Sequence, residues 1–195
     1  GYNGFGQASP PAVASCIDIA AGAYHGLALQ ANGEILGWGA NNYGQAKAPA
    51  GNQHVAVAAG GAHSLALRSD GKILAWGRNS LGQVEVPDGN DFVAISAGFS
   101  HSLALRSDGT ILGWGRNDFG QASPPNGRDF VGIAAGGLHS LALKSDGRII
   151  AWGHNNYRQA SPPGSDEFTA VAAGYWHSLG LKADGTVVGW GQNDR

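Results

Sequence analysis

Five histidines recur at a constant interval of 38 residues, and histidine is a common metal ligand and acid–base catalyst. They are His25, His63, His101, His139 and His177. A metal site needs several such ligands around one ion. One histidine in each of five units is instead distributed around the fold. We therefore expect each ring to hydrogen-bond backbone groups where a strand begins, with no metal site.

The rest of the sequence offers no catalytic pattern. It contains no Ser-His-Asp order with a nucleophile elbow, no glycine-rich phosphate loop between strand and helix, and no metal-ligand spacing beyond the repeat. We therefore expect a protein that is not an enzyme and that binds no cofactor.

Chemistry suited to binding lies in the residues that differ between units. The pair before each histidine is Ala23-Tyr24, Gly61-Ala62, Phe99-Ser100, Gly137-Leu138 or Tyr175-Trp176. The residue after each repeated Trp-Gly is Ala40, Arg78, Arg116, His154 or Gln192, and two positions later come Asn42, Ser80, Asp118, Asn156 and Asp194. Interface cores favour aromatic residues and arginine. The candidate binding residues are Tyr24, Phe99, Leu138, Tyr175, Trp176, Arg78, Arg116, Asp118 and His154.

The elements that position these residues follow from the repeat. Its tryptophans are Trp38, Trp76, Trp114, Trp152 and Trp190. In the third unit, residues 92–98, 101–105 and 110–114 have strand-like composition, and Asp108-Gly109 predicts a hairpin. Residues 121–125 end in two prolines, which suit a fourth strand at an outer edge. Four short antiparallel strands per unit predict an all-β fold, a single β-propeller domain of five blades over residues 1–195.

The phase of the repeat predicts how the ring closes. The chain begins with a fourth-strand segment, residues 7–11, and ends with only three strands, over residues 168–191. We expect residues 7–11 to pair with the strand that contains Trp190, which would leave no exposed sheet edge. Five units from a longer ring, for example of seven blades, remain the alternative.

Blade geometry predicts where the variable residues lie. The connections between the first and second strands, and between the third and fourth, emerge on the same face of an antiparallel blade. Both variable sets lie in these connections, so we expect one binding face, with Trp176 as its best single aromatic candidate. Positions that are apolar in every copy are interpreted as packing between blades, with ligand contact as the alternative, and the five tryptophans are interpreted as packing between blades. These positions are Phe5, Tyr43, Leu81, Phe119 and Tyr157.

Composition limits the partners and leaves the compartment open. Charged residues make up 13% of the chain and the net charge is -2, so we expect no nucleic-acid and no membrane partner. The single Cys16 cannot form an internal disulfide. The sequence starts at Gly1 and lacks Met, which predicts removal of a start residue, with or without a signal peptide. We expect a monomer.

The segment Ala59-Gly-Gly-Ala-His-Ser-Leu-Ala-Leu67, with Asp70-Gly71, Trp76-Gly77, Asn79 and Gly82-Gln83, resembles the repeat of the regulator of chromosome condensation family. The pattern recurs in all five units. The short spacing is similar to that of the bacterial branch that includes β-lactamase inhibitory protein II, which implies a seven-bladed secreted binder. The family also contains nucleotide-exchange factors, light receptors and ubiquitin-ligase modules, so the resemblance indicates the fold more strongly than the function.

These observations predict a protein-binding propeller, in the form of a secreted bacterial inhibitor whose protein partner is unidentified. Three alternatives stay open. One is a small-molecule or sugar-binding propeller, although its five pairs should then be alike. The others are nucleotide exchange on a small GTPase and a repeat protein without a natural partner, selected for the study of propeller assembly.

Overall fold

The computed structural model describes residues 2–12, 14–164 and 167–193, which form five antiparallel sheets of three strands each. The strands are β1 (Cys16–Ala21), β2 (His25–Gln30), β3 (Ile35–Gly39), β4 (His54–Ala59), β5 (His63–Arg68), β6 (Ile73–Gly77), β7 (Phe92–Ala97), β8 (His101–Arg106), β9 (Ile111–Gly115), β10 (Phe130–Ala135), β11 (His139–Lys144), β12 (Ile149–Gly153), β13 (Phe168–Ala173), β14 (His177–Lys182) and β15 (Val187–Gly191). None of these described residues forms a helix, so none forms one that could cross a membrane.

Local sequence explains the hairpin at the centre of each sheet. In the third unit, Leu105 of β8 lies opposite Ile111 of β9. Between them, Gly109 adopts a φ of 80°, which glycine accepts without strain, and the Asp108 carboxylate accepts the Thr110 backbone N–H at 3.0 Å. The predicted Asp-Gly hairpin is therefore confirmed.

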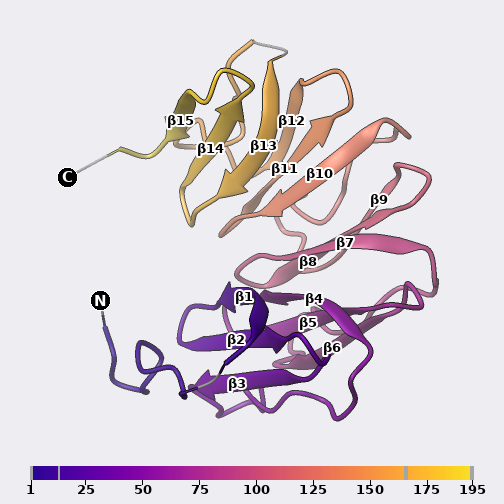
Figure 1. Cartoon of the computed structure of the whole chain (residues 1–195). Coiled ribbons are helices and arrows are strands. Elements are labelled where there is room, and N and C mark those ends of the chain that lie inside the picture. Colours follow the sequence, from indigo (N-terminus) through magenta and orange to yellow (C-terminus); the bar gives the residue numbers. More distant parts are fainter. Residues whose placement is uncertain (1, 13, 165–166, 194–195) are drawn as a thin grey trace.

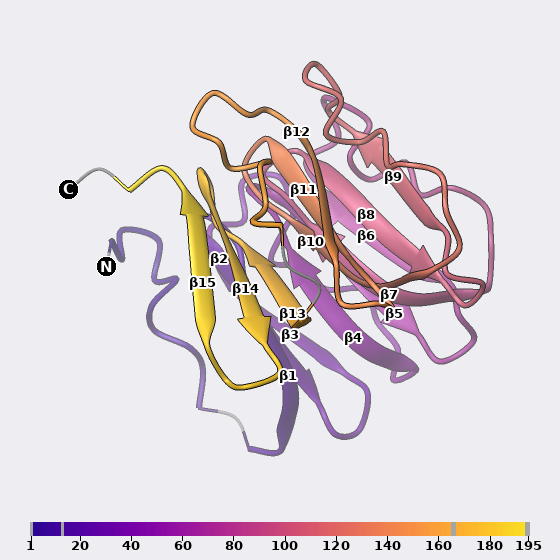
Figure 2. The ribbon, with the colours of Figure 1, turned by 90° about the horizontal axis from the view of Figure 1, so that it is seen from above.

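The five sheets follow one another along an open arc (Figure 1). Each first strand contacts the next, in the order β1, β4, β7, β10 and β13. The ends of all five line a central cavity of about 190 Å³. Figure 1 shows the sheets of β1–β3 and β13–β15 at the two ends of this series, and in the view from above β13–β15 lies in front (Figure 2).

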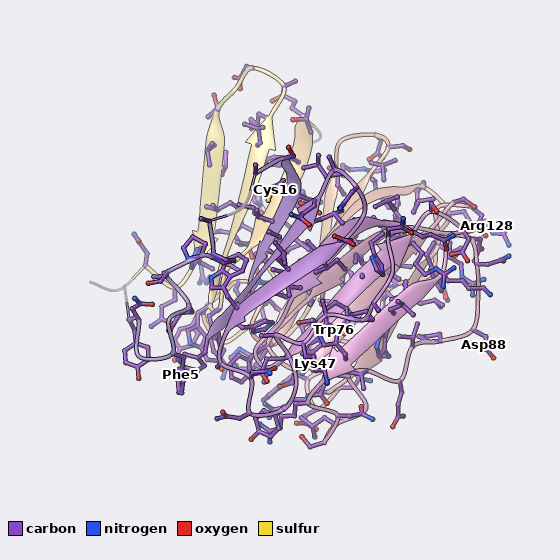
Figure 3. The ribbon with its side chains drawn as sticks, turned by 60° about the horizontal axis from the view of Figure 1, so that its bottom comes forward. Phe5, Cys16, Lys47, Trp76, Asp88 and Arg128 are labelled. Carbon is purple, nitrogen blue, oxygen red and sulfur yellow. The ribbon has the colours of Figure 1, made fainter. Side chains whose placement is uncertain are left out.

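Apolar side chains fill the spaces between neighbouring sheets. Leu65 and Leu67 of β5 pack in one cluster with Phe92 and Trp114 of the next sheet, and all four are nearly inaccessible to solvent. Figure 3 shows Trp76 among the strands, whereas Asp88 and Arg128 lie at the periphery. The prediction that the repeated tryptophans pack between blades is confirmed for Trp76, Trp114, Trp152 and Trp190, whereas Trp38 of the first sheet belongs to none of these clusters.

A polar joint, formed by four residues, accompanies each apolar space. At the first joint, the Ser64 hydroxyl donates to the Gln45 carbonyl at 2.8 Å, and Trp76 Nε1 donates to the same carbonyl at 2.9 Å. His25 Nε2 lies 2.8 Å from Ser64 Oγ. The same joint recurs between the other neighbouring sheets: His63, Gln83, Ser102 and Trp114; His101, Gln121, Ser140 and Trp152; His139, Gln159, Ser178 and Trp190.

The fourth strand of each blade was predicted wrongly as a sheet strand. Residues 7–11, 45–49, 83–87, 121–125 and 159–163 are described without strand structure. In the first sheet the Ala46 carbonyl lies close to Gly37 of β3, and the Gln45 carbonyl accepts from the side chains of Ser64 and Trp76. The prolines of these segments lack the N–H that a ladder needs, so the segments stay irregular.

The predicted ring closure is also absent from the structure. Within the described residues, β15 pairs only with β14, and a cavity of about 640 Å³ opens beside it. Residues 7–11 do not join that sheet, and Gln7 instead accepts the indole N–H of Trp38 at 2.9 Å. The outer sides of the first and last sheets, which we call the end faces, are correspondingly exposed. Ile19 is 74% exposed, whereas Val57 at the same position of the next unit is 7% exposed. Val187 is 61% exposed, whereas Ile149 at the same position of the preceding unit is 6% exposed.

The residues of the end faces explain why a fifth joint does not form. Gly26 occupies the position that carries Ser64, Ser102, Ser140 and Ser178 in the other units. A ring closed by the same joint would therefore offer no hydroxyl to His177. Cys16, likewise, occupies the position of the buried Phe92, Phe130 and Phe168, and it is exposed.

Replacing Gly98 with alanine is expected to destabilise the fold by about 3 kcal/mol, because the new methyl group would overlap the His101 ring and the Gly136 carbonyl. Gly164→Ala is the matched control, since a methyl group there meets nothing within 4 Å. Its effect should stay within about 0.5 kcal/mol. Urea denaturation of both variants measures the difference, and equal midpoints would contradict the close approach at Gly98.

Candidate binding face

The variable connections share one face, as the sequence predicts. In every sheet the residue after Trp-Gly donates its backbone N–H to the second residue of the variable pair: Ala40 to Tyr24, Arg78 to Ala62, Arg116 to Ser100, His154 to Leu138 and Gln192 to Trp176, at 2.8–2.9 Å. We call this surface the loop face. It comprises residues 23–24, 61–62, 99–100, 137–138 and 175–176, the connections 40–44, 78–82, 116–120, 154–158 and 192–193, and residues 2–6 in the same phase.

Two constant side chains hold each connection in shape. In the third unit, the Asn117 side-chain carbonyl accepts the Ala122 N–H at 2.9 Å, and that of Gln121 accepts the Phe119 N–H at 2.9 Å. The same pair of contacts is found around Tyr43, Leu81 and Tyr157. Because both amides are fixed, the side chain between them projects from a rigid support.

Aromatic rings from three sheets form a continuous cluster on this face. The Phe99 ring lies 5.2 Å from that of Tyr175, which lies 4.7 Å from Trp176. Trp176 contacts His154 at 5.3 Å and Tyr157 at 5.5 Å, and His154 contacts Phe119 at 4.8 Å. We call Phe99, Phe119, His154, Tyr157, Tyr175 and Trp176 the aromatic cluster. Four of the predicted binding residues are therefore brought together.

Phe119 and Tyr157 were interpreted as packing between blades, and the structure corrects this. They are 45% and 44% exposed, and Phe5, Tyr43 and Leu81 are similarly exposed. An exposed position can therefore carry an apolar residue in every copy, because the fold holds its backbone and leaves its side chain on the surface. The repeat pattern alone does not distinguish the two cases.

A second aromatic group lies at the N-terminal end of the loop face. The rings of Tyr2, Phe5 and Tyr24 meet edge to face at 5.7–6.2 Å. Tyr24 was predicted as a binding residue, whereas Tyr2 was missed. Its position 38 residues before Ala40 places it in the variable set, so the repeat phase could have identified it.

The charged candidates differ in their pairing. Arg116 Nε lies 2.6 Å from Asp118 Oδ2, whereas Arg78 Nε donates to the neutral Ser80 hydroxyl at 2.9 Å. Leu138 is only 8% exposed, so its side chain contributes little to the surface for which it was predicted. Asp194, the last of the variable positions, lies outside the described residues.

Four of the five repeated histidines, His25, His63, His101 and His139, lie inside the polar joints, whereas His177 is exposed beside β15. Since the Ser64 hydroxyl proton is donated to Gln45, the hydrogen bond of 2.8 Å requires His25 Nε2 to be the donor. Its Nδ1 is buried without a hydrogen-bond partner among the described residues, as in the next three histidines. The expected backbone partner is therefore wrong, because the serine of the next sheet takes its place.

Burial lowers the pKa of His25, His63 and His139 to about 4, and that of His101 to about 3. A proton on Nδ1 would be a buried charge with no acceptor. Among the described residues, no three His, Cys, Asp or Glu side chains are grouped as metal ligands would be.

Comparisons with known proteins identify the repeat. The model of the regulator of chromosome condensation repeat matches residues 16–45, 55–83, 92–121, 130–159 and 168–195. These matches cover most of the chain and one falls on each sheet. No curated protein matches the sequence.

Solved structures of this architecture superpose well. Human WBSCR16 is 20% identical, with a TM-score of 0.79 over 92% of this chain and 63% of its own. The ectodomain of the Physcomitrella patens receptor kinase CR4 is 27% identical, with a TM-score of 0.79 over 93% and 53%. Prp20p of Saccharomyces cerevisiae is 23% identical, with a TM-score of 0.77 over 90% and 58%.

The chain thus spans less than two thirds of these three structures. Its strands, its repeat motif and the matched family model agree in all five units. The chain belongs to the regulator of chromosome condensation repeat family.

Proposed function

We propose that this protein is a binding module that recognises a protein partner through its loop face. The aromatic cluster is the observation that carries the proposal. It joins side chains from three sheets, and Phe99, Phe119, Tyr157 and Tyr175 are each 38–45% exposed. Exposed aromatic rings on rigid supports are the residues that most often dominate the binding energy of protein interfaces.

Binding, rather than catalysis, is the role that the histidines support. Each buried serine donates its proton to a glutamine carbonyl and accepts from a histidine N–H, which is the reverse of an activated nucleophile. The low pKa keeps these rings neutral, and they lie between sheets rather than on the loop face.

The likeness to known binding proteins is consistent with a protein partner. Prp20p was described together with its binding properties to Gsp1p and histones, and yeast RCC1 was solved bound to Kap60. At these low identities the likeness transfers the fold alone, so nucleotide exchange gains no support. The variable pairs differ between the five units, and this disfavours a propeller with the same sugar-binding pocket in each unit. A secreted bacterial inhibitor remains the more specific form of the proposal, and it rests on the short repeat.

The test is affinity capture from extract and medium of the source organism, with the parent chain and a Trp176→Ala, Phe99→Ala variant as baits. The parent should recover a partner. The complex of that partner with the double variant should have a Kd more than about 30-fold larger, corresponding to 2 kcal/mol. Val93→Ala, Val131→Ala is the matched control, since these side chains are 53% and 55% exposed on strands outside the loop face. Equal capture by parent and double variant would contradict the proposal.

A further inference from the structure

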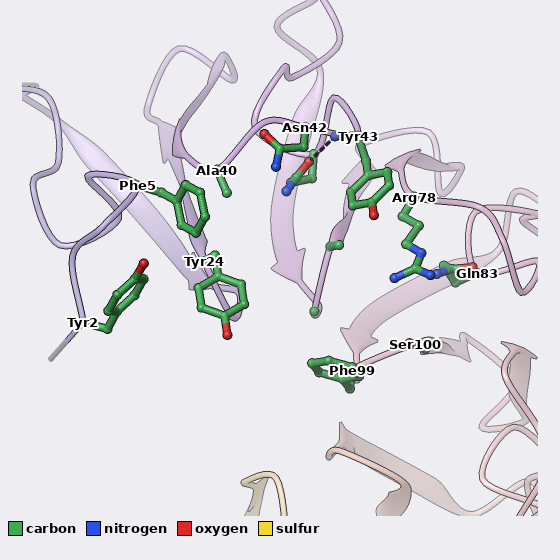
Figure 4. Close-up of a pocket in the computed structure, with 13 residues that line it drawn as sticks. Tyr2, Phe5, Tyr24, Ala40, Asn42, Tyr43, Arg78, Gln83, Phe99 and Ser100 are labelled. Atoms are coloured by element: carbon green, nitrogen blue, oxygen red, sulfur yellow. Dashed lines mark hydrogen bonds between the residues drawn. The ribbon is translucent and has the colours of Figure 1, made fainter.

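A cavity of about 550 Å³ opens on the loop face between the first three sheets (Figure 4). Its volume lies in the range of sites that enclose small organic groups. Five aromatic side chains line it, namely Tyr2, Phe5, Tyr24, Tyr43 and Phe99, and Arg78 is its one charged residue. The cavity is therefore apolar on most sides with a single cation.

Arg78 is held in place without being neutralised. Its Nε donates to Ser80 Oγ at 2.9 Å, and its guanidinium carbon lies 5.3 Å from the centre of the Tyr43 ring. No carboxylate of the described residues lies within ion-pair distance of it. Figure 4 shows the guanidinium below the Tyr43 ring. Its two terminal nitrogens thus remain available to an external acceptor.

The equivalent arginine of the next sheet gives a built-in comparison. Arg116 occupies the same repeat position and stacks on Phe119, with 6.0 Å between its guanidinium carbon and the ring centre. Its charge is compensated by Asp118 at 2.6 Å, where Arg78 has Ser80. Because Ser80 stands where Asp118 stands in the next sheet, the positive charge of Arg78 at the cavity has no carboxylate partner among the described residues.

We propose that this cavity binds a carboxylate next to an aromatic side chain, presented by a loop of the protein partner. An arginine fixed on two sides recognises a carboxylate with both terminal nitrogens, which a neutral amide cannot match. The surrounding rings would enclose the aromatic group edge to face, as Tyr2, Phe5 and Tyr24 already do with one another. This inference rests on the proposed function and names the chemistry recognised at one part of the loop face.

The test uses two dipeptides that differ only in charge, N-acetyl-Asp-Tyr-amide and N-acetyl-Asn-Tyr-amide, titrated at millimolar concentrations into the whole chain and followed by NMR. We expect the acidic dipeptide to bind about tenfold more tightly, with shifts confined to the cavity residues. Arg78→Gln should abolish the preference, while Arg116→Gln should retain it. Melting curves verify that both variants are folded.

Equal binding of the two dipeptides, no binding of either, or a preference that survives Arg78→Gln would each overturn the inference. The result is separable from the capture experiment, because the titration needs no natural partner and because Trp176, on which capture depends, does not line the cavity, although Phe99 belongs to both sites. If capture fails, the charge preference still reports on the cavity. If the preference fails, capture through the aromatic cluster is unaffected.

Discussion

Acidification from pH 7 to pH 4 is expected to unfold the protein. The four buried histidines have an ordinary pKa of 6.5 in the unfolded chain, but burial lowers it to about 4 for three of them and about 3 for His101. Between pH 6.5 and the lowered pKa of each histidine, that histidine is protonated in the unfolded state but stays neutral in the folded state. The free energy of unfolding is therefore greatest above pH 6.5 and falls as the pH drops towards 4.

The expected effect is large. Each fully developed shift lowers the free energy of unfolding by about 1.4 kcal/mol per pH unit, so four histidines together approach about 5 kcal/mol per unit. Domains of this size are stable by about 5–15 kcal/mol, so a fall of two or three units suffices. Urea denaturation followed by circular dichroism at half-unit steps measures the slope. A midpoint that stays constant from pH 7 to pH 5 would refute the prediction.

His101→Gln is the control for the histidine origin of this slope. Glutamine can still donate an N–H towards Ser140, whose Oγ lies 2.9 Å from His101 Nε2, but it does not titrate. The variant should be less stable at neutral pH, and its slope should be about a quarter smaller. An unchanged slope would place the titrating groups elsewhere.

Deleting residues 1–11 is expected to cost about 3 kcal/mol or more and to lower the melting temperature by several degrees. The deletion leaves the Trp38 indole N–H without the Gln7 carbonyl and removes Tyr2 and Phe5 from the Tyr24 ring. The half-buried hydrogen bond contributes about 0.5–1.5 kcal/mol, and the loss of the apolar contacts of Tyr2 and Phe5 adds to it.

Two further variants divide this cost. Trp38→Phe removes the indole N–H but keeps the segment, so it should account for about 1–1.5 kcal/mol. Deletion of residues 193–195 leaves β15 and the 2.9 Å bond from the Gln192 N–H to the Trp176 carbonyl intact, and it should change stability by less than about 0.5 kcal/mol. Thermal melts compare all three. If the two deletions melt alike, the N-terminal segment contributes no stability.

The strands and their arrangement could be predicted from the sequence, because the local turn and strand patterns agreed with the 38-residue repeat. Asp108-Gly109 fixes a hairpin, and the constant spacing of Trp76 and Trp114 fixes their common environment between sheets. The common face of the variable connections followed from antiparallel geometry alone. Each of these inferences depends on residues close in sequence or related by the repeat.

The failures concern contacts between units, where the partner of a side chain is set by tertiary structure. His25 bonds to Ser64, 39 residues away, and a propensity argument could not identify that serine. Closure failed for a similar reason: residues 7–11 match the repeat, but Gly26 and Cys16 on the facing surface do not. Exposure of Phe119 and burial of Leu138 depend on which side chains surround each loop, and the repeat does not encode that.

The polar joints link each unit only to the next, and this makes the molecule a linear array in its energetics. Stability in such an array is the sum of intrinsic unit terms and nearest-neighbour terms. The middle sheet, β7–β9, is held by a joint on both sides, whereas the first and last sheets each have only one. Local opening should therefore begin at the two ends and progress inward, so that the aromatic cluster, which extends to the last sheet, rests partly on the unit that opens first.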